Sequence, residues 1–345
     1  MKSLLALLLV AGSAHAENVW QHAVEASSPN EDREGYNRAV ADGDEQVMQA
    51  LNDGQSKANQ RQRVESALAS YDRAAAMMPK EPEVYYKIGR TLYSFYFEAC
   101  DNDFVARQKP SMLCPIAGFD TVHAKLIIEA WDKFEQLAPL DPRVSVERDD
   151  GALGVDFNLL FHRAILHTKF GDKKNLLAAI GDYERILHRT DKPGDTVLSN
   201  LAETYMMLGR LDDAIEMYRR ALMGQANVET AYGLAVALDR DERGDQALDL
   251  ILAQGQAAMA SFHDRVERGV TFFVPRGEEF YYYALGYEAF DLTDKAIASW
   301  QDYKKSDAAK AHPEYAARVK AHLDALLSHR SKAPVIDTPW RDFLR

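Results

Sequence analysis

Cysteine is almost absent from this chain of 345 residues, in which Cys100 and Cys114 are the only two. Two cysteines are too few for a disulfide-rich scaffold, and a zinc site would need two further ligands, of which only His123 lies nearby. Their separation also differs from the C-x-x-C spacing of a redox site. The cysteine content therefore argues against metal binding and against thiol chemistry.

The motifs that identify most enzymes and cofactor sites are also missing. The chain has no G-x-S-x-G, no P-loop, no G-x-G-x-x-G and no Cys–His signature. His162 and His167 are five residues apart, outside any H-E-x-x-H frame, and Asp141, Asp149 and Asp150 do not follow the spacing of a calcium loop. We therefore predict no catalytic residue, no metal site and no cofactor.

Positive charge and long apolar segments are scarce as well. The formal net charge is −12 and the sequence pI is about 5.4, which argues against nucleic acid and against anionic membrane surfaces as partners. Beyond the N-terminus no run is apolar enough to cross a membrane, so we expect no membrane insertion. The 12 prolines and 19 glycines stand mostly between segments of apolar periodicity, as in a chain of helices and short turns.

Residues 1–16 have the pattern of a secretory signal peptide. Lys2 supplies the positive end, residues 4–10 form a short apolar run, and an A-x-A site ends at Ala16. The run is too short to span the ~30 Å core of a bilayer, which takes about 20 residues. We expect cleavage after Ala16 and a periplasmic protein, possible association with the outer membrane being left open. In that oxidising compartment Cys100 and Cys114 are expected to form a structural disulfide.

The clearest internal pattern runs from Thr196 to Ala221. Two amphipathic helices are predicted, one with Leu198, Leu201, Ala202 and Tyr205 on its apolar face and one with Ala214, Ile215, Tyr218 and Ala221, and Gly209 marks the turn. This stretch resembles the tetratricopeptide repeat (TPR) family, with Leu198 at the family's Trp position. Ala214 and Tyr218 recur at Ala247 and Ile251, 33 positions later, which is the period of stacked helical hairpins.

Further units follow the same pattern less completely. The segment 83–92 has the spacing of a first helix, 121–138 that of a second, and 280–303 that of a whole hairpin. The resemblance implies an all-α fold, a right-handed α-solenoid of stacked helix-turn-helix hairpins with a C-terminal capping helix. The expected organisation is a signal peptide (1–16), an N-terminal extension (17–44), the TPR superhelix (45–310) with an insertion (97–120), the capping helix (311–330) and a tail (331–345).

In TPR proteins the first helices line a concave groove, and the resemblance therefore implies candidate binding residues. Aromatic, Arg and Met side chains are enriched in binding surfaces. The inner positions of the predicted first helices carry such residues, and internal packing of the aromatic stripe on 280–290 is an equal alternative. The candidate partner-binding residues are Tyr86, Arg90, Phe161, Glu203, Met206, Tyr232, Tyr283 and Tyr287.

The function implied by the resemblance is that of a protein–protein interaction scaffold or adaptor of the cell envelope. It would bind a partner peptide or helix within a secretion, pilus, motility or outer-membrane assembly. One alternative is a carbohydrate or cell-wall binder that stacks sugars on Tyr283, Tyr287 and Trp340. A less favoured alternative is an enzyme with its site in 94–120. The partner's identity and the oligomeric state stay open.

Overall fold

The computed structural model describes residues 32–52, 56–98, 113, 119–143, 145–146, 154–190, 193–224, 227–267 and 275–332. In these ranges the chain is all-α, as predicted, and no strand occurs in them. It divides into two compact units, 1–204 and 205–345, which are called unit 1 and unit 2.

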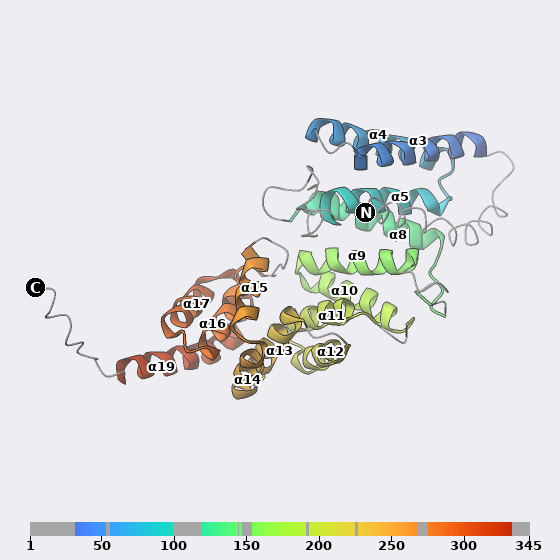
Figure 1. The fold of residues 1–345 in the computed structure, drawn as a ribbon. Helices are drawn as coiled ribbons and strands as arrows, with labels where there is room; N and C mark the ends of the chain where they lie inside the picture. The colour runs from blue at the N-terminus through green and yellow to red at the C-terminus, as the bar shows by residue number, and fades with distance from the viewer. Residues whose placement is uncertain are drawn as a thin grey trace, which may run out of the picture. The chain divides into compact units, whose positions relative to one another are not determined.

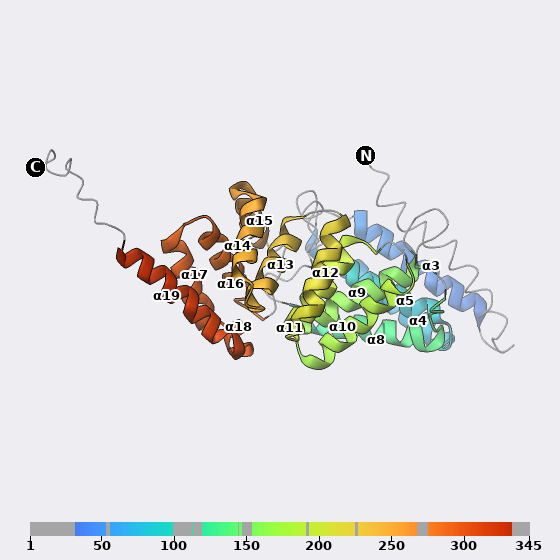
Figure 2. The same ribbon diagram turned by 90° about the horizontal axis from the view of Figure 1, so that it is seen from below.

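Unit 1 is built from consecutive helical hairpins whose members pack in the pairs α3–α4, α5–α8 and α9–α10 (Figures 1 and 2). Contacts between α4 and α5 and between α8 and α9 join one hairpin to the next. The elements are α3 (Arg33–Asn52), α4 (Lys57–Met77), α5 (Pro82–Tyr93), the π-helical turn η1 (Ser94–Glu98), α8 (Thr121–Leu137), α9 (Val155–Phe170), α10 (Lys173–Leu187) and the part of α11 (Asp195–Met207) up to Thr204.

Unit 2 repeats the arrangement with the pairs α13–α14 and α16–α17, and α13 also contacts α12. One further helix, α15, stands between the two hairpins in the chain. The elements are α12 (Leu211–Gly224), α13 (Val228–Arg240), α14 (Gly244–Gln254), α15 (Gln256–Glu267), α16 (Glu279–Ala289), α17 (Thr293–Lys305), α18 (Asp307–Ala311), η2 (Pro313–Tyr315) and α19 (Ala316–Lys332).

Local signals explain several of the helix ends. Ser56, Asp120, Asp172 and Asn227 accept hydrogen bonds from backbone N–H groups in the first turns of α4, α8, α10 and α13. Such caps satisfy donors that the helix itself leaves unpaired. Gly209 has a φ of 71°, a left-handed conformation that confirms the predicted turn after α11.

The cores of the hairpins contain the small and large residues that the repeat pattern predicts. In the central repeat Leu201, Ala202, Ala214 and Ala221 are fully buried, and Tyr218 is 2% exposed. Small and large apolar side chains are thus both buried at the positions that the repeat pattern assigns to the core. The predicted core of the 196–221 repeat is therefore confirmed.

The N-terminal boundary differs from the prediction. The N-terminal extension was expected to end at residue 44 and the repeats to start at residue 45, whereas the single helix α3 runs from Arg33 through Gly43 to Asn52 and packs along α4. A Cβ atom on Gly43 would lie 2.4 Å from Cε1 of Tyr71. This glycine therefore serves the close approach of an aromatic ring and does not end a helix.

Candidate interaction surface

Tyr86 and Arg90 lie on α5 in unit 1, where both side chains are half-buried. The Tyr86 ring packs against Phe134 of α8 with 5.6 Å between ring centroids, and burial raises the pKa of its hydroxyl. Arg90 pairs with Glu98 of η1 at 2.9 Å. Burial opposes the ionisation of Glu98, but the Arg90 guanidinium holds its pKa below the ordinary value. The two predicted residues thus form one partly exposed aromatic and charged patch.

Phe161 lies on α9, the first helix of the next hairpin, and Glu203 on α11. Phe161 is half-buried and stacks on Phe157 with 5.2 Å between centroids. Glu203 is half-buried as well. A hydrogen bond of 3.2 Å between Thr168 and Thr204 joins α9 to α11. The structure therefore places these two residues on adjacent first helices, and we call Tyr86, Arg90, Phe161 and Glu203 the first-helix face of unit 1.

His162 lies beneath this face and connects α5 with α9. Its imidazole stacks on Tyr93 at 4.2 Å between centroids, and burial together with the nearby Arg90 charge lowers its pKa to about 3. The ring is therefore neutral at physiological pH. Its Nδ1 has no hydrogen-bond partner among the described residues. This histidine therefore packs between two hairpins.

Tyr283 and Tyr287 lie on α16 in unit 2 and are half-buried by α15. His263 of α15 meets the Tyr283 ring at 3.8 Å between centroids, and its Nδ1 lies 3.3 Å from the Tyr287 hydroxyl. Lys295 stands 5.4 Å from the Tyr287 ring centre. Stacking of a sugar needs a free ring face, and α15 covers part of both rings. Internal packing, the alternative stated for this aromatic stripe, therefore accounts for much of the buried surface of Tyr283 and Tyr287.

Met206 and Tyr232 belong to the core. Each is 1% exposed, and Tyr232 stacks on Phe262 of α15 with 4.8 Å between centroids. A buried side chain offers a partner no surface, so neither of these predicted contact residues is accessible to a partner in this structure. The repeat position alone did not distinguish Tyr232 from Tyr283, because their exposure depends on where α15 lies.

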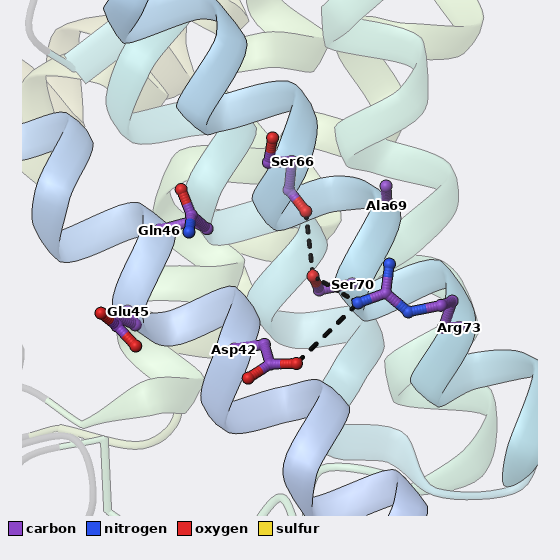
Figure 3. Close-up of a pocket in the computed structure, with 7 residues that line it drawn as sticks. All are labelled: Asp42, Glu45, Gln46, Ser66, Ala69, Ser70 and Arg73. Carbon is purple, nitrogen blue, oxygen red and sulfur yellow. Dashed lines mark hydrogen bonds and ion pairs between the residues drawn. The ribbon is translucent and has the colours of Figure 1, made fainter.

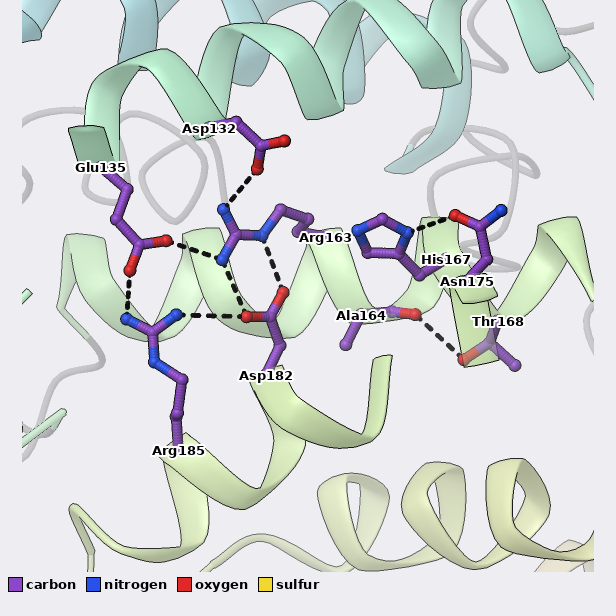
Figure 4. A network of polar contacts seen from close by, with 9 residues as sticks. All are labelled: Asp132, Glu135, Arg163, Ala164, His167, Thr168, Asn175, Asp182 and Arg185. Atoms are coloured by element: carbon purple, nitrogen blue, oxygen red, sulfur yellow. Dashed lines mark hydrogen bonds and ion pairs between the residues drawn. The ribbon is translucent and has the colours of Figure 1, made fainter. Parts of the chain in front are cut away.

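A buried ionic network in unit 1 was not predicted (Figure 4). Arg163 of α9, with a side chain 6% exposed, pairs with Asp182 of α10 at 2.7 Å and with Asp132 and Glu135 of α8 at 2.8 Å each. Arg185 bridges Glu135 and Asp182. Burial opposes the ionisation of Glu135, but the two arginines lower its pKa. The network links three helices of two successive hairpins and has its charges paired.

A second polar cluster holds the capping helix α19 in unit 2. Asp239 of α13 has a fully buried side chain that accepts from Tyr281 at 2.7 Å and from Arg318 at 2.5 Å, and lies 3.0 Å from Nε2 of His322. Burial opposes its ionisation, but the hydrogen bonds from His322 and Arg318 lower its pKa to about 2. The Asp-Arg pair at 239–240, which interrupts an apolar run, was the available sequence signal.

Glu288 of α16 completes this cluster from the other side of the His322 ring. Its carboxylate lies 2.9 Å from Nδ1 of His322 and accepts from Nε1 of Trp300 at 3.2 Å. Burial alone would lower the pKa of His322, but the two carboxylates raise it to about 9. The imidazole is therefore charged at neutral pH, and the predicted capping helix is attached by paired buried charges as well as by its apolar face.

The surface between α3 and α4 has a shallow hollow of about 340 Å³ (Figure 3). Its polar groups are already engaged with one another, since Ser70 donates to the carbonyl of Ser66 at 3.0 Å and Arg73 donates to Ser70 at 3.0 Å. Arg73 also lies 4.0 Å from Asp42. The lining side chains leave no buried, unpaired group aimed into the hollow, and it lacks the features of a specific ligand site.

Several predictions concern residues outside the described ranges. These are the signal peptide 1–16, Cys100 and Cys114 with most of the insertion around them, Asp149 and Asp150, and Trp340 in the tail. They remain predictions. Asp141, by contrast, is described, and it accepts hydrogen bonds from the backbone and side chain of Arg143.

None of the helices in the described ranges combines the length and apolar character that a membrane crossing requires. No group of three or more His, Cys, Asp or Glu side chains in the same ranges is arranged to hold a metal ion.

Comparison with known proteins gives structural neighbours only. No family model and no curated protein matches the sequence. Two crystal structures of MamA align with TM-scores of 0.39 and 0.40, at 15% and 16% identity, over 60% and 67% of this chain and 93% and 99% of theirs. The P58(IPK) TPR domain aligns with a TM-score of 0.20 at 13% identity, over 83% of this chain and 99% of that domain. The superpositions are loose. The chain's TPR-type fold is seen in its consecutive helical hairpins.

Proposed function

We propose that this protein is a protein–protein interaction scaffold or adaptor, and that the first-helix face of unit 1 binds a partner peptide or helix. The observation that carries the proposal is the half-buried state of Tyr86, Arg90 and Phe161 on two adjacent first helices. Aromatic and Arg side chains that are held in place by packing and still reach the surface are typical anchors of protein interfaces.

The chemistry of the face suggests how a partner is held. The rings of Tyr86 and Phe161 supply apolar area whose geometry is fixed by Phe134 and Phe157. Ordered side chains lose little conformational freedom on binding, which favours affinity. Glu203 and the overall charge of −12 favour association with a basic partner segment, mainly through the rate of encounter.

We further propose that the protein works in the cell envelope. The signal-peptide pattern of residues 1–16 supports export, and an exported helical-repeat protein without catalytic motifs suits an adaptor in an envelope assembly. In that oxidising compartment Cys100 and Cys114 would form a disulfide.

The test is site-specific photo-crosslinking in the periplasm, with a photoreactive phenylalanine placed singly at Tyr86 or Phe161. Matched controls carry the same group at Val122 of α8 or Leu177 of α10, which are apolar, 66% and 50% exposed, and on second helices. We expect a discrete crosslinked protein from positions 86 and 161 and none from 122 and 177. Equal crosslinking from the control positions, or from none of the four, would contradict the proposed surface.

A further inference from the structure

The helix α15 does not belong to either of the hairpins that flank it. It contacts α13 and α16, the first helices of two successive repeats, and also α14 (Figures 1 and 2). In the repeat pattern the first helices carry the candidate binding positions, Tyr232 on α13 and Tyr283 and Tyr287 on α16. A segment of the chain itself thus covers the surface on which the sequence predicts a partner.

The contacts of α15 resemble those of a docked helical peptide. Phe262 is 1% exposed and stacks on Tyr232 and on Tyr282, with 4.8 Å and 5.9 Å between centroids. Met259 is buried one turn earlier, and its sulfur lies 3.6 Å from the place that a Cβ on Gly286 would occupy. Apolar anchors at i and i+3 are the usual contacts of an amphipathic helix in a groove.

A charged contact accompanies the two apolar anchors. Arg265, three residues after Phe262, forms an ion pair with Glu229 of α13. His263, which stands between Phe262 and Arg265 in the chain, contacts Tyr283 and Tyr287 of α16. The face formed by α13 and α16 therefore accepts a large apolar side chain, an aromatic ring and a basic group at successive intervals of three residues.

The contact of α15 with α13 and α16 buries few side chains, and two polar atoms in it lack hydrogen-bond partners among the described residues. Met259 and Phe262 are the only buried side chains of its twelve residues. The hydroxyl of Tyr232 and Nε2 of His263 are buried without a hydrogen-bond partner among the described residues. Gly255, which connects α15 to α14, has a φ of 82°, a conformation that side chains other than glycine rarely adopt. A helix attached by two buried anchors, one ion pair and the His263 contacts, with unpaired polar atoms beneath it, makes few contacts that a competitor would have to replace.

We propose that α15 is a built-in ligand of unit 2 and that a partner helix with the pattern apolar-x-x-aromatic-x-x-basic replaces it on α13 and α16. This rests on the proposed interaction function and gives it a partner chemistry at a second surface. Displacement exposes the rings of Tyr232, Tyr282 and Tyr283 to the incoming helix. Binding at unit 2 is therefore coupled to release of α15.

The first test uses a fluorescent peptide with the sequence of residues 256–267, stapled between positions 257 and 261, which are exposed in α15. It is titrated into the full chain and into the variant Met259→Ala/Phe262→Ala, in which α15 has lost its anchors. We expect the variant to bind the peptide at least tenfold more tightly than the natural chain, where α15 competes. A control peptide with Phe262→Ala should bind neither protein.

Absence of peptide binding to a variant of unchanged helical circular dichroism would overturn the proposal. Because that variant can fail to fold, hydrogen exchange of the natural chain provides the second test. Amides of α15 should exchange at least tenfold faster than those of α13 and α16, and equal protection would show that α15 is a permanent part of the core. Neither readout involves positions 86 and 161, so failure here is distinguishable from failure of the surface on unit 1.

Discussion

Single glycines on first helices let aromatic rings reach the helix backbone. A Cβ on Gly89 would lie 2.3 Å from Nε1 of Trp131, a fully buried side chain without room to move. We expect Gly89→Ala to lower the free energy of unfolding by about 1–3 kcal/mol, as overpacked cores do. Gly181→Ala on α10 is the control, because nothing lies within 4 Å of its Cβ position, and it should gain about 0.5–1 kcal/mol. Urea unfolding followed by circular dichroism measures both, and equal effects would contradict the packing argument.

The charge on His322 makes the stability of unit 2 depend on pH. Its pKa is raised from 6.5 to about 9 by Asp239 and Glu288, with Arg318 and Trp300 beside it. A raised pKa means that the folded form holds the proton more tightly, so the stabilisation is complete below about pH 6.5 and is lost as the pH rises through 9. This stabilisation contributes about 3 kcal/mol to the free energy of unfolding. Unfolding free energies measured between pH 6 and 10 should fall by this amount, and His322→Gln should remove most of the fall.

At the scale of helices, the Arg163 network fixes α8, α9 and α10 to one another. Arg163→Met leaves Asp182, whose side chain is 7% exposed, buried without its main counter-charge. Removing one member of a buried pair costs about 3–5 kcal/mol. The double variant Arg163→Met/Asp182→Leu should recover most of that loss. Chemical denaturation gives both values, and Arg143→Met, in an exposed pair, should leave the curve unchanged. A double variant no more stable than the single one would contradict the assignment.

The sequence predicts helices better than it predicts what glycine does within them. Gly209 was expected to mark a turn and has a left-handed φ, whereas Gly43 lies inside α3, at the place where the N-terminal extension was expected to give way to the repeats. The two cannot be told apart locally, because the role of Gly43 depends on Tyr71, which is 28 residues further along the chain. Helix periodicity is a local property, and the close approach of a ring is not.

The candidate site was predictable in part for the same reason. Position within the repeat placed Tyr86, Arg90 and Phe161 on first helices, where the structure shows them half-buried, and their role as partner contacts stays a prediction. It did not indicate that Tyr232 is covered, because the burial of this side chain depends on where α15 lies. The sequence also did not indicate that Arg163 is buried in an ionic network. Its partners stand 19 to 31 residues away, and charged residues on helices are usually solvated.

At the scale of the whole molecule, the proposed export would determine which partners the protein meets. If residues 1–16 are a signal peptide, protein isolated from the periplasm begins at Glu17. Intact-mass measurement and N-terminal sequencing test this directly. Ala14→Arg/Ala16→Arg, which removes the small residues that the peptidase requires, should leave the leader attached and reduce the periplasmic yield. An unprocessed natural chain in the cytoplasm would refute export and, with it, the envelope context.

The short connection at Gly255 has a consequence for how unit 2 would respond to its surroundings. A ligand joined to its own site by one residue acts at an effective concentration in the millimolar range. A free helix making equal contacts at micromolar concentration is outcompeted by about a thousandfold. Helices that are clustered, or anchored beside the protein in an assembly, reach comparable local concentrations. Unit 2 would thus distinguish an assembled partner from the same helix free in solution.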